Sequence, residues 1–170
     1  GYTVPVRRLL AGKANIHRIP ENGGPSARGV EAIDRWVGEG TWNVIHFNFG
    51  LHDIKIMPDG DRQVSKEDYA ANLKILVARL QETGARLIWC TTTPVPAGDL
   101  NPERWVEDVP TYNAIALGIM EKEGIVINDL YTFALDRLDR IQLPENVHFT
   151  DEGSEALAVP VAASIEAALQ

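Results

Sequence analysis

A carboxylate and an imidazole stand three residues apart near the end of the chain. Glu145 and His148 lie in a loop-like stretch, 143–153, that leads into a helical pattern. This spacing can bring both side chains into one cleft, where the imidazole would take a proton from a nucleophile and the carboxylate would hold its tautomer. The alternative is a surface pair without a catalytic role, so other segments must support the chemistry.

A glycine ends an apolar run in the middle of the chain, and two polar residues lie shortly after it. Gly50 follows Phe49 and precedes Leu51, His52 and Asp53. Glycine permits a tight turn, so the ring N–H of His52 can point into the mouth of a sheet and stabilise an oxyanion. Gly50 and Asp53 would support this turn. The alternative is a plain loop histidine with Asp53 capping the turn.

A glycine pair marks the third segment, 22–26, which opens a helical pattern. Backbone N–H groups of Gly23 and Gly24 at this position can bind an anion, and Asn22 would support them. The alternative is an ordinary turn that requires a positive φ angle.

Short apolar runs alternate with amphipathic runs along the chain, which is typical of βαβ units and a parallel sheet in a single domain over residues 1–170. Because sites in such sheets gather beyond the carboxyl ends of the strands, we expect segments 22–26, 50–53 and 91–96 to share one cleft with the His148 loop.

Ser65 and Asp151 are expected to cap helices. Strands are expected at 15–19, 43–49, 86–91 and 125–127, and helices at 4–11, 26–37, 66–83, 111–123, 129–138 and 151–169.

Together these segments resemble the SGNH hydrolase family, the GDSL-like esterases and lipases. Residues 145–153 resemble the family's Asp-x-x-His block, residues 50–53 its Gly-x-Asn-Asp block, and Gly23 or Gly24 its oxyanion glycine. The resemblance implies a three-layer α/β/α sandwich with a parallel, flavodoxin-like sheet. It also implies an ester hydrolase that removes small acyl groups, such as acetyl, from a carbohydrate or similar small-molecule alcohol. His148 would act as the base, Glu145 would orient it, His52 would help to hold the oxyanion, and no cofactor is implied.

The chain departs from the family pattern at three positions. The Gly-Asp-Ser block is missing, and Gly1-Tyr2 resembles the pair that follows this block in relatives. We therefore expect the first strand and the nucleophilic serine to lie upstream of residue 1, and the 170-residue chain to be an incomplete, inactive gene product. In addition, His52 stands where the family has asparagine, and Glu145 stands where it has aspartate.

Composition excludes several other classes of protein. Sixteen Lys and Arg residues against 24 Asp and Glu residues give a net charge of -8, which opposes binding to nucleic acid. No apolar run approaches the ~20 residues that a membrane span requires. The single cysteine, Cys90, excludes an internal disulfide framework and is expected to be a small core residue. The composition indicates neither a compartment nor an oligomeric state.

Two further functional classes are alternatives to the esterase. A zinc hydrolase could recruit His46, His52, Asp53 and His148, but the chain lacks His-x-x-x-His spacing, so we expect no metal site. A non-catalytic carbohydrate- or partner-binding module on the same fold is favoured by the missing nucleophile. Trp105, in the irregular stretch 97–110, would line a substrate groove or act as a local clasp.

Overall fold

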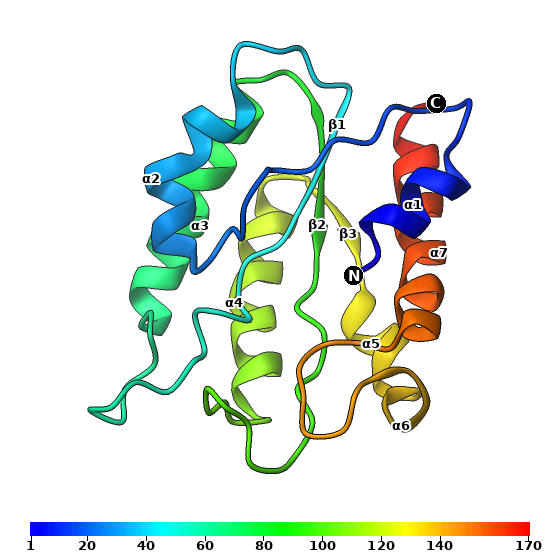
Figure 1. Ribbon diagram of the computed structural model, residues 1–170. Helices are drawn as coiled ribbons and strands as arrows, with labels where there is room; N and C mark the ends of the chain where they lie inside the picture. Colours follow the sequence, from blue (N-terminus) through cyan, green and yellow to red (C-terminus); the bar gives the residue numbers. More distant parts are fainter.

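The chain folds into a parallel sheet with helices on both faces, so the expected α/β class is confirmed (Figure 1). A computed structural model describes residues 1–170. The strands lie in the order β1-β2-β3, and both neighbouring pairs are parallel, with Ile45 beside Leu87 and Trp89 beside Ile127. In chain order the elements are α1 (Thr3–Leu9), α2 (Ser26–Val37), β1 (Val44–Phe47), α3 (Lys66–Gln81), β2 (Arg86–Cys90), α4 (Asp108–Lys122), β3 (Val126–Asn128), α5 (Leu130–Leu135), α6 (Leu138–Ile141) and α7 (Asp151–Ala168).

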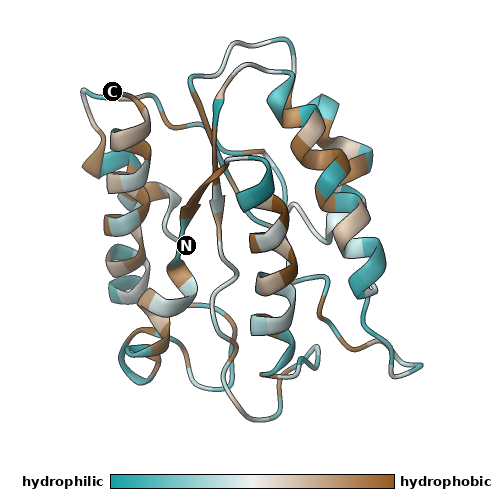
Figure 2. Ribbon diagram, turned by 180° about the vertical axis from the view of Figure 1, so that it is seen from behind, coloured by the Kyte–Doolittle hydropathy of each residue, from teal (hydrophilic) through white to brown (hydrophobic).

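The sheet separates two hydrophobic cores, because successive residues of a strand point to opposite faces. On β2, Leu87 and Trp89 belong to the core beneath α2, α3 and α4, whereas Ile88 and Cys90 belong to the core beneath α1 and α7. Figure 1 shows these two helical layers, and Figure 2 shows the hydrophobic and hydrophilic faces of their helices. Cys90 is thus a core residue, and burial raises the pKa of its thiol to about 12. None of the helices combines the length and apolarity that crossing a bilayer would need.

Segment 15–19 is not a strand, which corrects the expectation for this part of the chain. Its backbone forms no ladder hydrogen bonds, and β1 is paired with β2 alone. A strand needs a partner for its N–H and C=O groups, so a segment without a neighbouring strand stays irregular. A side chain holds it in place, because Arg7 Nε donates to the carbonyl of Ile16 at 2.9 Å.

Two expected helices differ from those observed. Helix α4 begins at Asp108, before the expected start at 111, and includes Pro110 in its first turn. The first N–H groups of a helix have no intrahelical partner, so proline removes no hydrogen bond there. The expected helix at 129–138 is divided into α5 and α6. Arg137 lies at this break, and its Nη1 donates to the carbonyl of Phe133 at 2.7 Å.

The two longest helices each begin at a side-chain cap. Ser65 caps α3 as expected, with its Oγ accepting from the Asp68 N–H at 3.0 Å. Thr150, rather than the expected Asp151, caps α7, and its Oγ1 accepts from the Gly153 N–H at 2.9 Å. The cap of α7 therefore lies two residues after His148 and fixes the end of the His148 loop.

His46 lies inside β1 and serves as a packing residue. Its ring meets that of Tyr2 edge to face, with centroids 6.5 Å apart, and its Nε2 lies 3.1 Å from Asn128 Nδ2. Burial lowers the pKa of His46 to about 4, so the imidazole is neutral in the folded protein at neutral pH.

We expect this buried imidazole to make the protein sensitive to acid. Between the ordinary pKa of 6.5 and about 4, the unfolded imidazole takes up a proton that the folded one does not, so the free energy of unfolding falls as the pH falls. At about 1.4 kcal/mol per pKa unit, the loss from His46 is on the order of 3 kcal/mol. Urea unfolding near neutral pH and near the lower end of this window measures it.

His46→Gln should lose less stability on acidification than the wild type. His17→Gln, which changes an exposed histidine, serves as the control. Equal acid sensitivity of the wild type and His46→Gln would contradict this assignment.

Candidate active site

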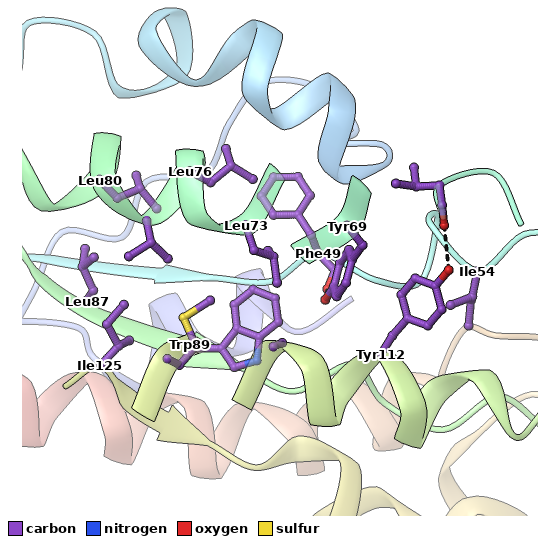
Figure 3. Close-up of a cluster of buried hydrophobic side chains, with 14 of the residues drawn as sticks. Phe49, Ile54, Tyr69, Leu73, Leu76, Leu80, Leu87, Trp89, Tyr112 and Ile125 are labelled. Atoms are coloured by element: carbon purple, nitrogen blue, oxygen red, sulfur yellow. Dashed lines mark hydrogen bonds between the residues drawn. The ribbon is translucent and has the colours of Figure 1, made fainter. Parts of the chain in front are cut away.

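The turn after β1 requires glycine at position 50. Gly50 has a φ angle of +146°, and a Cβ atom there would lie 2.3 Å from Thr92 Oγ1 in the loop after β2. The preceding Phe49 is buried with Tyr69 and Leu73 of α3 (Figure 3). The Tyr69 hydroxyl donates to the Phe49 carbonyl at 2.8 Å. The backbone of the turn is thus held against both α3 and the loop after β2.

Asp53 connects this turn to the start of α2. Its Oδ1 accepts from the Ser26 N–H at 2.8 Å and also from the Ser26 hydroxyl, which in turn accepts from Asn72 Nδ2 at 3.1 Å. Burial raises the pKa of the Asp53 carboxyl, and the Ser26 hydrogen bonds oppose this rise. Two of the predicted site segments, 22–26 and 50–53, are therefore joined by a buried hydrogen-bond network.

The two glycines of segment 22–26 have different backbone environments. Gly24 has a φ angle of +66°, and its N–H donates to Asn22 Oδ1 at 2.9 Å. The N–H of Gly23 makes no hydrogen bond within the protein. Gly23 therefore keeps a free donor, whereas that of Gly24 is engaged in the turn.

The His148 loop is closed at its base and fastened to the loop after β2. Gln142 and Phe149 form an antiparallel bridge, and the Leu143 N–H donates to the His148 carbonyl at 3.0 Å. Gln142 Nε2 also donates to the carbonyl of Pro94 at 3.0 Å. These contacts place the loop beside segment 91–96, as the sequence analysis expects.

Asn146, which was not among the residues predicted for the site, hydrogen-bonds the imidazole of His148. Its Oδ1 lies 2.7 Å from His148 Nδ1 and accepts from the His148 backbone N–H at 2.9 Å. An amide oxygen only accepts, so this contact puts the ring proton on Nδ1 and leaves Nε2 as a free base. An asparagine two residues before the histidine fits a local Asx turn, which is the signal that the sequence offered.

Glu145 makes no hydrogen bond with His148. It is exposed and has a left-handed backbone, with a φ angle of 48°. Its side chain lies toward Gly98, where a Cβ atom would be 3.5 Å from Glu145 Cγ. The orienting role predicted for Glu145 stays a prediction, because the Nδ1 contact in this structure belongs to Asn146.

His52 is partly buried and lies within electrostatic range of His148. Burial lowers its pKa to about 4, and the positive charges of Lys55 and Arg104 add to this effect. The imidazole is therefore neutral at neutral pH and can donate one ring N–H. His52 lies in the turn after β1, and the His148 loop is fastened to the loop after β2, so both residues lie beyond the carboxyl end of the sheet.

Two candidates remain, the alternative zinc set and Trp105. No group of three or more His, Cys, Asp or Glu side chains lies in an arrangement that could hold a metal ion, so the alternative zinc set is not assembled. Trp105 lines an open cavity of about 350 Å³ and is also stacked on the Arg62 guanidinium, 4.1 Å from the ring centroid. The contact with Arg62 fits the predicted local clasp, and a role of Trp105 in a substrate groove stays a prediction.

An α/β/α sandwich with these residues beyond the carboxyl ends of its strands is typical of hydrolases. The model of the GDSL-like lipase/acylhydrolase family matches residues 8–156. The chain therefore belongs to this family of ester hydrolases, and the predicted resemblance is confirmed. A search of the curated proteins found no match.

Solved structures of esterases and acylhydrolases have the same fold. A lipase/acylhydrolase from Enterococcus faecalis has a TM-score of 0.81 at 18% identity, covering 99% of this chain and 86% of that one. The acetyl xylan esterase AlAXEase has a TM-score of 0.79 at 15% identity, covering 97% and 90%. An acetyl xylan esterase from Geobacillus stearothermophilus has a TM-score of 0.75 at 16% identity, covering 96% and 79%. At these identities the likeness establishes the fold.

Proposed function

We propose that this chain is the larger part of an esterase that removes short acyl groups, such as acetyl, from a carbohydrate or a similar alcohol. The observation that carries the proposal is the orientation of the His148 imidazole by Asn146, which leaves Nε2 as a free base. A neutral His52 in the turn after β1 supports the proposal. The names of the acetyl xylan esterases among the similar structures support the substrate class.

In the proposed reaction a serine Oγ attacks the acyl carbon while Nε2 of His148 takes the hydroxyl proton. The negative charge that forms on the former carbonyl oxygen is stabilised by the ring N–H of His52 and the backbone N–H of Gly23, with Gly24 as the second choice. His148 then gives the proton to the departing alcohol. Water attacks the acyl-enzyme by the same route and releases the carboxylic acid.

The nucleophile is proposed to be a serine supplied by sequence that precedes Gly1. No hydrogen bond joins a serine hydroxyl of this chain to a histidine: that of Ser26 contacts Asp53, and that of Ser65 caps α3. In addition, β1 is an edge strand that pairs with β2 alone, so its other edge has no strand partner. Gly1 itself packs against Ser154 in the first turn of α7, the helix that follows the His148 loop.

The test compares this chain with the longer protein that includes the encoded residues before Gly1. The longer protein is expected to hydrolyse p-nitrophenyl acetate, and the 170-residue chain is expected to show only the background rate. Activity in the shorter chain that disappears in His148→Ala would place the nucleophile within it and overturn the proposal. An inactive longer protein that binds an acetylated oligosaccharide would instead support the binding module.

A second prediction concerns the residue that orients His148. In the longer protein we expect Asn146→Ala to lower kcat by at least about tenfold, because Nδ1 loses the acceptor that fixes its tautomer. Glu145→Gln should have a smaller effect, since its side chain lies toward Gly98. Steady-state kinetics of the two variants measure the difference. The reverse order would restore Glu145 as the orienting acid.

A further inference from the structure

Two cations flank the candidate active site. Lys55 follows the 50–53 turn, and Arg104 comes from the irregular stretch before α4. Both charges act on His52 and contribute to its lowered pKa, and the charge of Arg104 also lowers the pKa of Lys55. The backbone places both cations near His52: the Lys55 N–H donates to the His52 carbonyl at 3.3 Å, and the Ile56 N–H donates to the Glu103 carbonyl at 2.9 Å. Arg104 Nε donates to the Leu51 carbonyl at 2.8 Å. We call Lys55, Arg104 and His52 the cationic cluster.

The charge of the cationic cluster is not neutralised within the protein. Arg104 is only 8% exposed, and its Nε and Nη1 donate to the carbonyls of Leu51 and Pro102 at 2.8 and 2.9 Å, while Nη2 makes no hydrogen bond. The ion pairs of the molecule all lie elsewhere. Nearby Arg62, by contrast, is held by both oxygens of Asp108 at 3.0 Å. A buried charge without a counter-charge is costly, which indicates a site completed by an anion.

A cavity gives a ligand access to this charge. Arg104 and Trp105 line the open cavity of about 350 Å³ together with residues 96–98, and Gly98 of this wall lies beside Glu145 in the His148 loop. One wall of the cavity therefore adjoins the His148 loop. Glu107 lines the cavity and Glu145 lies beside Gly98 of its wall, but neither carboxylate is within 4.0 Å of a Lys55 or Arg104 nitrogen.

We propose that Arg104 and Lys55 bind an oxyanion group, a carboxylate or a sulfate, on the alcohol part of the ester substrate. This inference rests on the proposed esterase function and narrows its substrate class. The alcohol part is favoured because the cavity has the volume and the aromatic wall that a ring-sized group requires, whereas the proposed acyl group is short. The guanidinium can offer its free Nη2 to one oxygen, and the ammonium of Lys55 acts as a mobile point charge.

The test uses three acetyl esters of similar shape in the longer protein: 4-acetoxybenzoate, 4-acetoxybenzenesulfonate and the neutral 4-acetoxybenzamide. The readout is kcat/KM for each anionic ester divided by kcat/KM for the neutral one, and each variant is compared with the wild type so that differences in intrinsic reactivity cancel. We expect Lys55→Gln to lower this ratio by about tenfold for at least one anion, mostly through KM. The carboxylate and sulfonate arms show which oxyanion is preferred.

Matched variants separate binding from folding. Lys74→Gln makes the same change at an exposed position of α3 and should leave the ratio unchanged. Arg104→Gln should lower the ratio further, but this variant also removes the hydrogen bond to the Leu51 carbonyl. The result for Lys55→Gln is therefore the one that decides the test. An unchanged ratio in Lys55→Gln, or an equal loss on neutral and anionic esters, would overturn the proposal, because the cations would then serve the reaction centre or the loop alone.

A binding measurement on the 170-residue chain needs no turnover. We expect 4-hydroxybenzoate, but not 4-hydroxybenzamide, to shift the NMR signals of the His52 and His148 rings, and we expect Lys55→Gln and added salt to weaken the effect. If the longer protein hydrolyses no ester but this selective binding persists, the esterase proposal fails and the anion site stands. If it hydrolyses esters without preference and neither probe binds selectively, the anion site fails and the esterase stands.

Discussion

Replacing His148 with alanine is expected to lower kcat/KM for p-nitrophenyl acetate by on the order of 10⁴ in the longer protein that is proposed to supply the nucleophile. The imidazole is the only group that the proposed reaction uses to take and return the proton. Its Nε2 is free because Asn146 occupies Nδ1, and the base of its loop is closed by the Gln142–Phe149 bridge. The loss should fall on kcat, since the exposed ring contributes little to the hydrophobic surface that binds substrate.

The control for this variant is His17→Ala. His17 is also exposed, and its ring meets that of Trp42 edge to face, two residues before β1 and at the opposite end of the strand from the candidate site. It should retain wild-type activity. Thermal unfolding should give similar midpoints for both variants, which separates a catalytic loss from a folding defect. Hydrolysis by His148→Ala at a rate above that of a variant without the nucleophilic serine would remove His148 from the proposed mechanism.

Replacing His52 with alanine is expected to lower kcat by on the order of 10²–10³, with a smaller change in KM. The ring N–H is placed to stabilise charge that exists only in the transition state, so its loss should affect the chemical step more than substrate binding. Burial and the neighbouring positive charges keep this imidazole neutral, with a pKa of about 4. It can therefore donate a hydrogen bond without adding a net charge to the site.

A second variant, His52→Asn, introduces the asparagine that the family motif has at this position. An asparagine amide also donates an N–H, so this variant should recover part of the activity that His52→Ala loses. Both kcat and KM are measured for the two variants. If the alanine variant keeps wild-type kcat, the oxyanion donor must lie elsewhere, and Gly23 would remain as the proposed donor.

Local patterns in the sequence were sufficient for much of the architecture. Alternating apolar and amphipathic runs predicted the parallel α/β class, and Ser65 was correctly predicted as the cap of α3. Gly50 was predicted as the residue of a tight turn, which its φ angle and the close approach of Thr92 bear out. These features depend on backbone conformation and on hydrophobic periodicity, which nearby residues largely determine.

Segment 15–19 illustrates where local patterns are not sufficient. Its composition resembles that of a strand, but strand formation depends on a partner elsewhere in the chain, and here the segment has none. The cap of α7 also differs from the prediction, because it depends on a contact outside the helix. Gly153 packs so closely on the Ile141 carbonyl that a Cβ atom would lie 2.1 Å from its oxygen, and this contact helps to determine that Thr150 caps the helix.

The sequence by itself determined which segments contain the reactive residue types: the glycine pair, the turn at 50–53 and the loop with His148. Only the tertiary structure decided the contacts among them. It placed Asn146 rather than Glu145 at Nδ1 of His148, joined Ser26 to Asp53, and buried Arg104 beside His52 without a counter-charge. The physical reason is that residue types and backbone preferences are local properties, whereas burial, charge proximity and hydrogen-bond partners arise when distant segments pack together.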